Sequence, residues 1–142
     1  MSKPQPGEVR SRAERMFGDD QASQSLGMQL LEVTPGAARL QMTVTAAMLN
    51  GHGMCHGGMI FALADSAFAF ACNSHGEVTV AAAGSIEFLA PARAGERLIA
   101  EARELWRAGR NGLYDVAVTN AAGTVVAQFR GRSRRITPAK PA

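Results

Sequence analysis

A glycine- and histidine-rich run from Asn50 to Gly58 leads directly into an apolar segment, Met59 to Ser74, that contains a single carboxylate, Asp65. A glycine-rich turn that opens a helix leaves backbone N–H groups unpaired at the positive end of the helix dipole. An isolated acid in an apolar helix is costly unless it has a partner or a chemical role. Together, these features could supply an oxyanion donor and a base or nucleophile, which are the groups that acyl-transfer hydrolysis requires.

The spacing of these groups indicates that one chain cannot complete the site. Gly57 and Asp65 are eight residues apart, which is about 12 Å along a helix that rises about 1.5 Å per residue. One carbonyl group cannot lie within hydrogen-bond reach of both. If both act, two antiparallel helices that meet at a two-fold axis would bring Gly57 of one chain near Asp65 of a second chain. The sequence therefore predicts a site shared between two subunits.

Two other chemistries can be weighed on the same residues. Cys55 precedes His56 and could suggest a thiol nucleophile, but sequence neighbours seldom reach the required geometry, and no orienting acid is evident. A zinc set would need histidine and cysteine ligands at a compact spacing, which this chain lacks. We therefore expect no metal. The residues considered for that set are His52, Cys55, His56, Cys72 and His75.

Length and composition predict one globular domain. A chain of 142 residues can bury one core, and 46% hydrophobic with 19% charged residues is ordinary for a soluble protein. The start of the chain has no apolar signal-like region, and the longest apolar segment is interrupted by Asp65 and Asn73. Two cysteines make no disulfide framework. We expect a cytoplasmic protein that does not enter a membrane.

The predicted elements are two helices and six strands. A short helix is expected from Glu8 to Phe17, and a long buried helix from Met59 to Ser74 that ends with Gly76 at the C′ position. We expect flexible tails at residues 1–7 and 137–142 around a core of about residues 26–136. The strands are expected at Met28–Val33, Ala38–Val44, Val78–Ala90, Arg97–Arg107, Gly112–Asn120 and Thr124–Ile136.

Short turns between consecutive strands imply antiparallel pairs. One long helix that is apolar on most sides must be covered, so the fold class is α+β, with an antiparallel sheet wrapped around the helix. Alternation along the strand from Arg97 to Arg107 would place five side chains on one face: Leu98, Ala100, Ala102, Glu104 and Trp106.

Much of the basic excess behind the net charge of +3 lies near the C-terminal end of the sequence, at Arg130, Arg132, Arg134 and Arg135. These arginines could be a solvated edge strand that resists pairing, or a phosphate site. A single-stranded nucleic acid platform would interleave aromatic residues with the arginines, and only Phe129 is nearby. We therefore expect no nucleic acid partner.

The motifs together resemble those of the hotdog-fold acyl-CoA thioesterases, and especially the phenylacetate-degradation branch of that family. The resemblance covers roughly Leu26 to Ile136. His-Gly-Gly alone is a weak signal. The resemblance is specific because Asp65 follows Gly57 by eight residues and the strand segments match as well. The segments that carry it are Asn50-Gly51-His52, Cys55-His56-Gly57-Gly58, Leu63 to Ser74, Ile86 to Pro91 and Phe129 to Ser133.

The resemblance implies catalytic roles for matched residues. Asp65 would be the catalytic carboxylate, and the Gly57 N–H would polarise the thioester carbonyl. Asn50 matches the amide that orients the carbonyl or the attacking water. His52 and His56 match loop histidines that shape the site, and His56 could also bond to the thioester. A purely structural alternative stands beside each role: a satisfied buried acid for Asp65, loop packing and hydrogen bonding for the histidines, tight helix entry for Gly57, and a generic turn for Asn50.

The resemblance also implies substrate contacts. The hydroxyl partner of the acid stays open, because Ser66 directly follows Asp65 and Ala69, one turn on, cannot supply a hydroxyl. Phe88 lies in a matching strand motif and is a substrate-binding candidate. Independently of the resemblance, guanidinium groups bond phosphate through two parallel hydrogen bonds. The candidates for the phosphates of coenzyme A are therefore Arg93, which comes shortly after Pro91, and the arginines on and after the last strand, Arg130, Arg132, Arg134 or Arg135.

The implied function is hydrolysis of an acyl-CoA thioester to a free acid and coenzyme A. Coenzyme A is part of the substrate, and no further cofactor is expected. Phenylacetyl or hydroxyphenylacetyl groups are favoured, and medium-chain acyl groups remain open. The family resemblance implies a homodimer at least, and commonly a homotetramer. The alternatives are a non-catalytic acyl-CoA-binding module, and a hotdog dehydratase, whose Asp-x-Asn-Pro-x-x-His pattern is absent from this sequence.

Overall fold

The computed structural model describes residues 5–136, so residues 1–4 and 137–142 of the two expected tails lie outside the described residues. In the rest of the expected N-terminal tail, Gln5 is the extended N-cap and Pro6 and Gly7 are helical. Helix α1 (Pro6–Asp19) begins two residues before the predicted start. Proline suits the first turn of a helix, because the N–H that it lacks would have no hydrogen-bond partner within the helix at that position. A second, short helix, α2 (Gln21–Ser25), follows directly.

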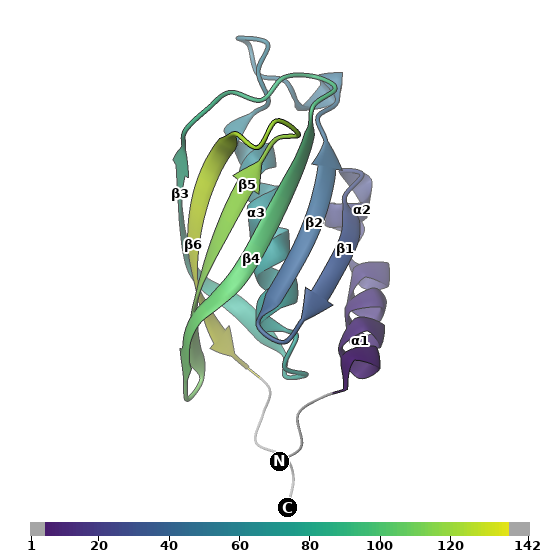
Figure 1. The fold of residues 1–142 in the computed structure, drawn as a ribbon, viewed down its shortest axis with the longest axis vertical. Coiled ribbons are helices and arrows are strands. Elements are labelled where there is room, and N and C mark those ends of the chain that lie inside the picture. Colours follow the sequence, from purple (N-terminus) through teal and green to yellow (C-terminus); the bar gives the residue numbers. More distant parts are fainter. Residues whose placement is uncertain (1–4, 137–142) are drawn as a thin grey trace, which may run out of the picture.

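Six antiparallel strands form one curved sheet in the order β1-β2-β4-β5-β6-β3 (Figure 1). The sequence predicted all six strands, and their ends agree to within about two residues. β3 forms one edge of the sheet and pairs only with β6. The strands are β1 (Gln29–Thr34), β2 (Ala37–Thr43), β3 (Thr79–Phe88), β4 (Arg97–Ala108), β5 (Asn111–Thr119) and β6 (Val125–Arg135).

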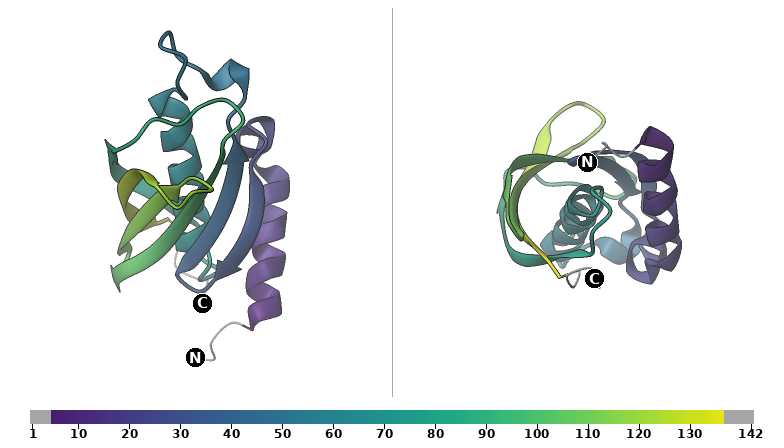
Figure 2. Two further views of the ribbon diagram at one scale, coloured as in Figure 1. Left: turned by 45° about the horizontal axis from the view of Figure 1, so that its top comes forward. Right: turned by 90° about the horizontal axis from the view of Figure 1, so that it is seen from below.

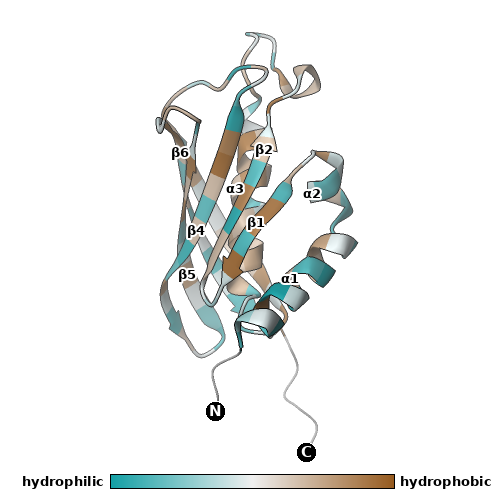
Figure 3. Cartoon of the chain, turned by 45° about the vertical axis from the view of Figure 1, so that its right-hand side comes forward, coloured by the Kyte–Doolittle hydropathy of each residue, from teal (hydrophilic) through white to brown (hydrophobic). Residues whose placement is uncertain are grey.

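The long helix α3 (Gly57–Cys72) lies inside the curve of the sheet, as the view from below shows (Figure 2). The predicted α+β architecture, a sheet wrapped around one helix, is therefore confirmed. Leu63, Ala64, Ala67 and Phe68 of the helix are fully buried against the strands. α1 lies outside, against β1, and is largely hydrophilic (Figure 3). Within residues 5–136, no helix is both long enough and apolar enough to cross a membrane.

The ends of α3 differ from the prediction. The helix begins at Gly57 rather than Met59, because the His56 side chain caps it. It ends at Cys72 with Asn73 as C-cap, so the predicted stop at Gly76 is wrong. Asn73 ends the helix because its side chain donates to the carbonyls of Ala69 and Thr79 and accepts the Thr79 N–H. Gly76, with φ of 84°, belongs to the turn that follows.

β4 also departs from simple alternation. Leu98, Ala100 and Ala102 are buried as expected, but Trp106 is 52% exposed. The pairing of β4 with β5 shifts between Glu104 and Trp106, and such a bulge reverses the faces of the residues that follow it. After the bulge, the alternation along β4 is therefore reversed, and Trp106 points away from the face that carries Leu98, Ala100 and Ala102.

Candidate active site

The N-terminus of α3 presents an unused backbone donor. The Nδ1 atom of His56 accepts the Gly58 N–H at 3.0 Å, and the backbone carbonyl of His56 accepts from Met59. Among the described residues, nothing accepts the Gly57 N–H. Because its Nδ1 is an acceptor, neutral His56 carries its proton on Nε2. His56 thus caps the helix that holds the free donor of Gly57.

Asn50 organises the loop that leads into α3. Its Oδ1 accepts the backbone N–H of His52 at 2.9 Å and that of Met54 at 3.2 Å. The side-chain oxygen is therefore occupied by the loop, while the amide N–H groups of Asn50 have no partner among the described residues. Asn50 can offer donors, but not an acceptor, to a bound molecule.

A pocket of about 410 Å³ lies at this end of α3, with a mostly apolar lining. The structure brings three of the predicted site residues together in its wall: Asn50, Gly57 and Phe88. The Phe88 ring lies so close to Gly57 that a Cβ there would be 2.9 Å from the ring's Cζ. Glycine at position 57 therefore lets the aromatic ring pack against the start of the helix. The further lining residues are Met54, Cys55, Ile60, Leu89, Ala90, Pro91 and Ala92.

Asp65 lies two turns further along α3 and does not line this pocket. Its side chain is half-buried and makes no hydrogen bond to any described residue. Burial raises the pKa of its carboxyl group, and the nearby carboxylate of Asp20 raises it further. Asp65 shares a helix face with Gly58, Ala62 and Ala69, which the sheet leaves partly uncovered.

Next to Asp65, a chain of hydrogen bonds joins α3 to α2. The buried Ser23 Oγ lies 2.6 Å from Asp20 Oδ2 and 2.8 Å from Ser66 Oγ. A carboxylate only accepts, so Ser23 donates to Asp20, and Ser66 donates to Ser23. The single hydroxyl proton of Ser66 is thus committed. Ser66, predicted to bind substrate, can only accept from another molecule.

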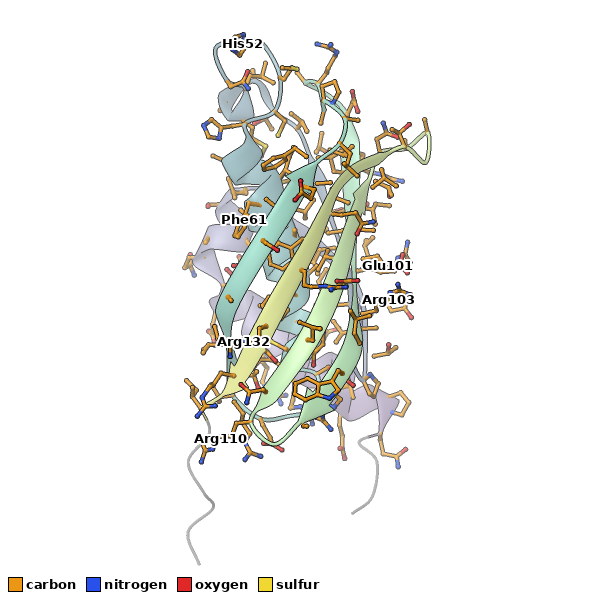
Figure 4. All side chains as sticks on the ribbon, turned by 90° about the vertical axis from the view of Figure 1, so that its left-hand side faces the viewer. His52, Phe61, Glu101, Arg103, Arg110 and Arg132 are labelled. Carbon is orange, nitrogen blue, oxygen red and sulfur yellow. The ribbon has the colours of Figure 1, made fainter. Side chains whose placement is uncertain are left out.

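The other predicted substrate contacts are dispersed. His52 lies exposed at one end of the molecule, in the loop before α3, and Arg132 lies toward the other end (Figure 4). Arg93 directly follows the pocket residue Ala92 and is exposed. Arg132 donates to Asn111 at 3.3 Å. Within one chain, the structure therefore places Arg93, and not Arg132, near the pocket.

The two cysteines do not have the properties of nucleophiles. Both are buried, burial raises the pKa of the Cys55 thiol, and it raises that of Cys72 to about 12. Such thiols stay protonated near neutral pH. In the part of the chain that the structure describes, no group of three or more His, Cys, Asp or Glu side chains could hold a metal ion.

Sequence reasoning missed Asp20 and Ser23 as neighbours of the carboxylate. A local signal was available, because Asp20 is the N-cap of α2 and accepts the Ser23 N–H at 2.9 Å. That signal predicts a helix start. It does not predict that the start packs beside Asp65, more than forty residues away in the sequence.

Comparison with known proteins identifies the class. The thioesterase superfamily profile matches residues 52–127, which include both Gly57 and Asp65. The chain belongs to the hotdog-fold thioesterases, and its enzyme class is thioester hydrolase. It is 46% identical to acyl-coenzyme A thioesterase PaaI of Escherichia coli over 124 residues, which are 87% of this chain and 89% of that protein.

Solved structures agree with this assignment. The chain matches the structure of E. coli PaaI, from the phenylacetic acid degradation operon, with a TM-score of 0.91 and 44% identity over 92% of this chain and 95% of that one. It also matches smu.793 of Streptococcus mutans, solved with acetyl-CoA bound, with a TM-score of 0.75 and 26% identity over 80% of this chain and 91% of that one.

Proposed function

We propose that this protein hydrolyses acyl-CoA thioesters at a site formed by Gly57 of one subunit and Asp65 of another. The observation that carries the proposal is a free backbone donor and a carboxylate without a hydrogen-bond partner on the same helix. They are about 12 Å apart along α3, so the two groups of one chain cannot both reach the same thioester carbonyl. Two copies that pair with antiparallel α3 helices would complete two equal sites.

The surface of the chain supports such a pair. β3 is an edge strand, and both of its faces are largely exposed over Thr79–Phe88. Val80 and Phe88 of β3 and Leu89, which directly follows it, are 43–59% exposed, which is unusual for large apolar side chains along one edge of a sheet. Long unpaired edges are templates for pairing with a second chain. A copy paired here would also cover the open face of α3 that carries Asp65. We expect the dimers to pair further into a homotetramer.

In the proposed reaction, the Asp65 carboxylate takes a proton from water as the water oxygen attacks the thioester carbonyl carbon. Negative charge develops on the carbonyl oxygen, and the Gly57 N–H donates to it at the positive end of the helix dipole. The carbon–sulfur bond then breaks, and the coenzyme A thiolate takes the proton that Asp65 received. A raised pKa brings the carboxylate closer to the range that suits a general base at neutral pH.

The alternative is direct attack by Asp65, which forms a mixed anhydride that water then cleaves. Single turnover in ¹⁸O-water with excess enzyme separates the two routes. The general-base route puts solvent oxygen into the released acid. In the anhydride route, the water that cleaves the anhydride leaves its oxygen in the Asp65 carboxylate. That oxygen reaches the released acid only in a second turnover, when the labelled carboxylate attacks again.

The acyl group that fits best is aryl-acetyl. The pocket beside Gly57 has a volume within the range typical of small-molecule sites, and the walls include Met54, Ile60, Phe88 and Leu89. Such walls suit a ring better than a charged acid. The names of the relatives, a PaaI thioesterase and a protein of the phenylacetic acid degradation operon, point the same way. Medium-chain acyl groups are the second candidate, because the same walls suit an alkyl chain.

A substrate panel followed by release of free thiol tests the function. We expect phenylacetyl- and hydroxyphenylacetyl-CoA to be hydrolysed with the highest kcat/KM, and Asp65→Asn to lower turnover by roughly 10²–10⁴-fold while still binding acyl-CoA. Asp65→Asn should also fold, because it removes a half-buried charge that has no partner. Near-normal turnover in that variant, or a wild type that binds CoA esters without releasing thiol, would contradict the proposal.

A further inference from the structure

A second pocket lies at the other end of α3, where the β4–β5 hairpin extends beyond the end of the helix. Its volume is about 260 Å³, and we call it the hairpin pocket. Figure 4 shows Arg110, at the hairpin tip, at the end of the molecule opposite His52. The proposed reaction uses none of its residues. The lining includes Cys72, His75, Arg107, Arg110, Ser133 and Arg135.

The register of the sheet sets a row of residues across the floor of the hairpin pocket. Arg107 pairs with Gly112, and Gly112 pairs with Ser133. Directly paired residues in an antiparallel sheet point to the same face, here the face of the buried Ser133. A Cβ on Gly112 would lie 2.6 Å from Ser133 Oγ, so the glycine leaves the space beside this hydroxyl open.

Ser133 is an unusual buried hydroxyl. The residue is 3% exposed, yet its Oγ has no hydrogen-bond partner among the described residues. The two other buried serines of the described chain, Ser23 and Ser74, both have partners. The Oγ atom itself is not fully enclosed, so the hydroxyl opens into the hairpin pocket and can bond to a molecule that the pocket admits.

Arg135 supplies a second unused donor. Its Nη1 donates to Glu77 Oε2 at 2.6 Å, but its buried Nε–H has no acceptor among the described residues. The backbone N–H of Arg135 bonds to the carbonyl of Arg110 at 2.7 Å, which holds the two arginines side by side. Because that Nε atom is enclosed by the protein, Arg135 and Arg110 present the rest of their guanidinium groups to the hairpin pocket, beside the open hydroxyl of Ser133.

The acids near this space are already paired. Glu104 Oε1 accepts from Tyr114 Oη and His75 Nε2, each at 2.8 Å, and Arg107 Nε is 3.8 Å away. Although burial would raise the pKa of Glu104, these hydrogen bonds lower it, so Glu104 stays a carboxylate whose partners are fixed. His75 Nε2 and the Tyr114 hydroxyl are therefore occupied by Glu104. The positively charged donors that remain in the pocket lining belong to its arginines.

We propose that the hairpin pocket binds one phosphate group. Ser133, Arg107, Arg110 and Arg135 bring several donors to one pocket, which suits an acceptor with several oxygens, and guanidinium matches phosphate through paired hydrogen bonds. Three arginines line the pocket against one lining carboxylate, Glu77, so an anion is favoured. The volume is below the roughly 300–1,000 Å³ of pockets for drug-sized molecules, so the site suits a phosphate group and not a whole nucleotide.

Titration calorimetry with inorganic phosphate at constant ionic strength tests this site directly, whether or not the enzyme hydrolyses thioesters. We expect saturable binding that Arg110→Gln and Ser133→Ala each weaken about tenfold. Ser133→Ala removes a hydroxyl that has no partner, so its melting temperature should match the wild type. Arg103→Gln is the matched control, because it loses the same charge on the outer face of β4. No saturable binding by the wild type, or equal weakening by Arg103→Gln, would overturn the proposal.

Two sources could supply the phosphate: free inorganic phosphate, or the 3′-phosphate of coenzyme A. Competition separates them. If coenzyme A displaces inorganic phosphate and dephospho-coenzyme A does not, the site holds the 3′-phosphate, and Arg110→Gln should then weaken coenzyme A binding as well. If phosphate binds equally to the protein saturated with coenzyme A, the site takes the free anion. Either result supports a phosphate site.

Discussion

At the scale of single residues, the central feature is a carboxylate held in an unfavourable environment. Asp65 is half-buried, lacks a hydrogen-bond donor among the described residues, and faces the second carboxylate of Asp20. Burial and Asp20 both raise its pKa above the value in the unfolded chain. The folded state therefore binds the Asp65 proton more tightly, and this contribution to stability is lost as pH rises through the folded pKa. A site that accepts this cost indicates use of the carboxylate in chemistry.

Asp20→Asn should change the pH dependence of catalysis. The substitution keeps an N-cap acceptor for Ser23 but removes the negative charge that raises the pKa of Asp65. A general base works when deprotonated, so the acidic limb of the kcat/KM profile should move to lower pH. The measurement is the pH–rate profile of the variant beside that of Asp19→Asn, which loses the same charge one residue away. Identical profiles for Asp20→Asn and wild type would show that Asp20 does not act on Asp65.

At the scale of elements, α3 is both the core of the fold and the carrier of the site. The sheet buries most of its sides, which sets its position, and the His56 cap leaves the Gly57 donor open at its end. Phe88, at the end of β3, packs against that same end of α3. The proposed oxyanion donor and the pocket wall are therefore one packing unit, although they come from segments about thirty residues apart.

Gly57→Ala tests this unit. Alanine favours helix, but its Cβ would lie 2.9 Å from the Phe88 ring, so the ring or the helix start must move. A shift of about 1 Å at the reacting centre can lower kcat/KM by up to about 10²-fold. Gly51→Ala is the control, because a Cβ there meets nothing within 4 Å. Adding Phe88→Leu to Gly57→Ala replaces the ring with a smaller side chain and should restore part of the lost activity. Equal activity of Gly57→Ala and Gly51→Ala would contradict the packing argument.

At the scale of the whole molecule, the proposed function requires each chain to contribute one half to each of two different sites. The exposed edge strand β3 and the open face of α3 offer a surface where a second copy can pair. In the proposed dimer, isologous pairing would give two equal sites, each with the loop of one subunit and the acid of the other. The hairpin pocket lies at the far end of α3 in the same chain, away from the pocket at Gly57.

Mixed dimers of two inactive variants test the shared site. Asn50→Asp keeps the acceptor that holds the loop but loses the amide donors, and Asp65→Asn loses the carboxylate. In a mixed dimer, one shared site collects both lesions and the other is intact, so about half of the wild-type activity should return. The assay is thiol release by co-expressed, doubly tagged dimers, with each parent homodimer as control. Verified mixed dimers no more active than the parents would refute the shared site.

The sequence by itself determined the central helix, its acid, the glycine at its start and the alternating strands, and it predicted a site shared by two subunits, which stays a prediction. These features follow from local periodicity and from the fixed rise of a helix, which depend on residues close together in the chain. Only the tertiary structure decided that Phe88 lies on Gly57, that Asp20 faces Asp65, that Ser66 bonds to Ser23, and that Ser133 opens into a basic pocket. Those contacts join distant segments, and they depend on strand register, on the bulge in β4 and on how α2 packs, none of which a local pattern encodes.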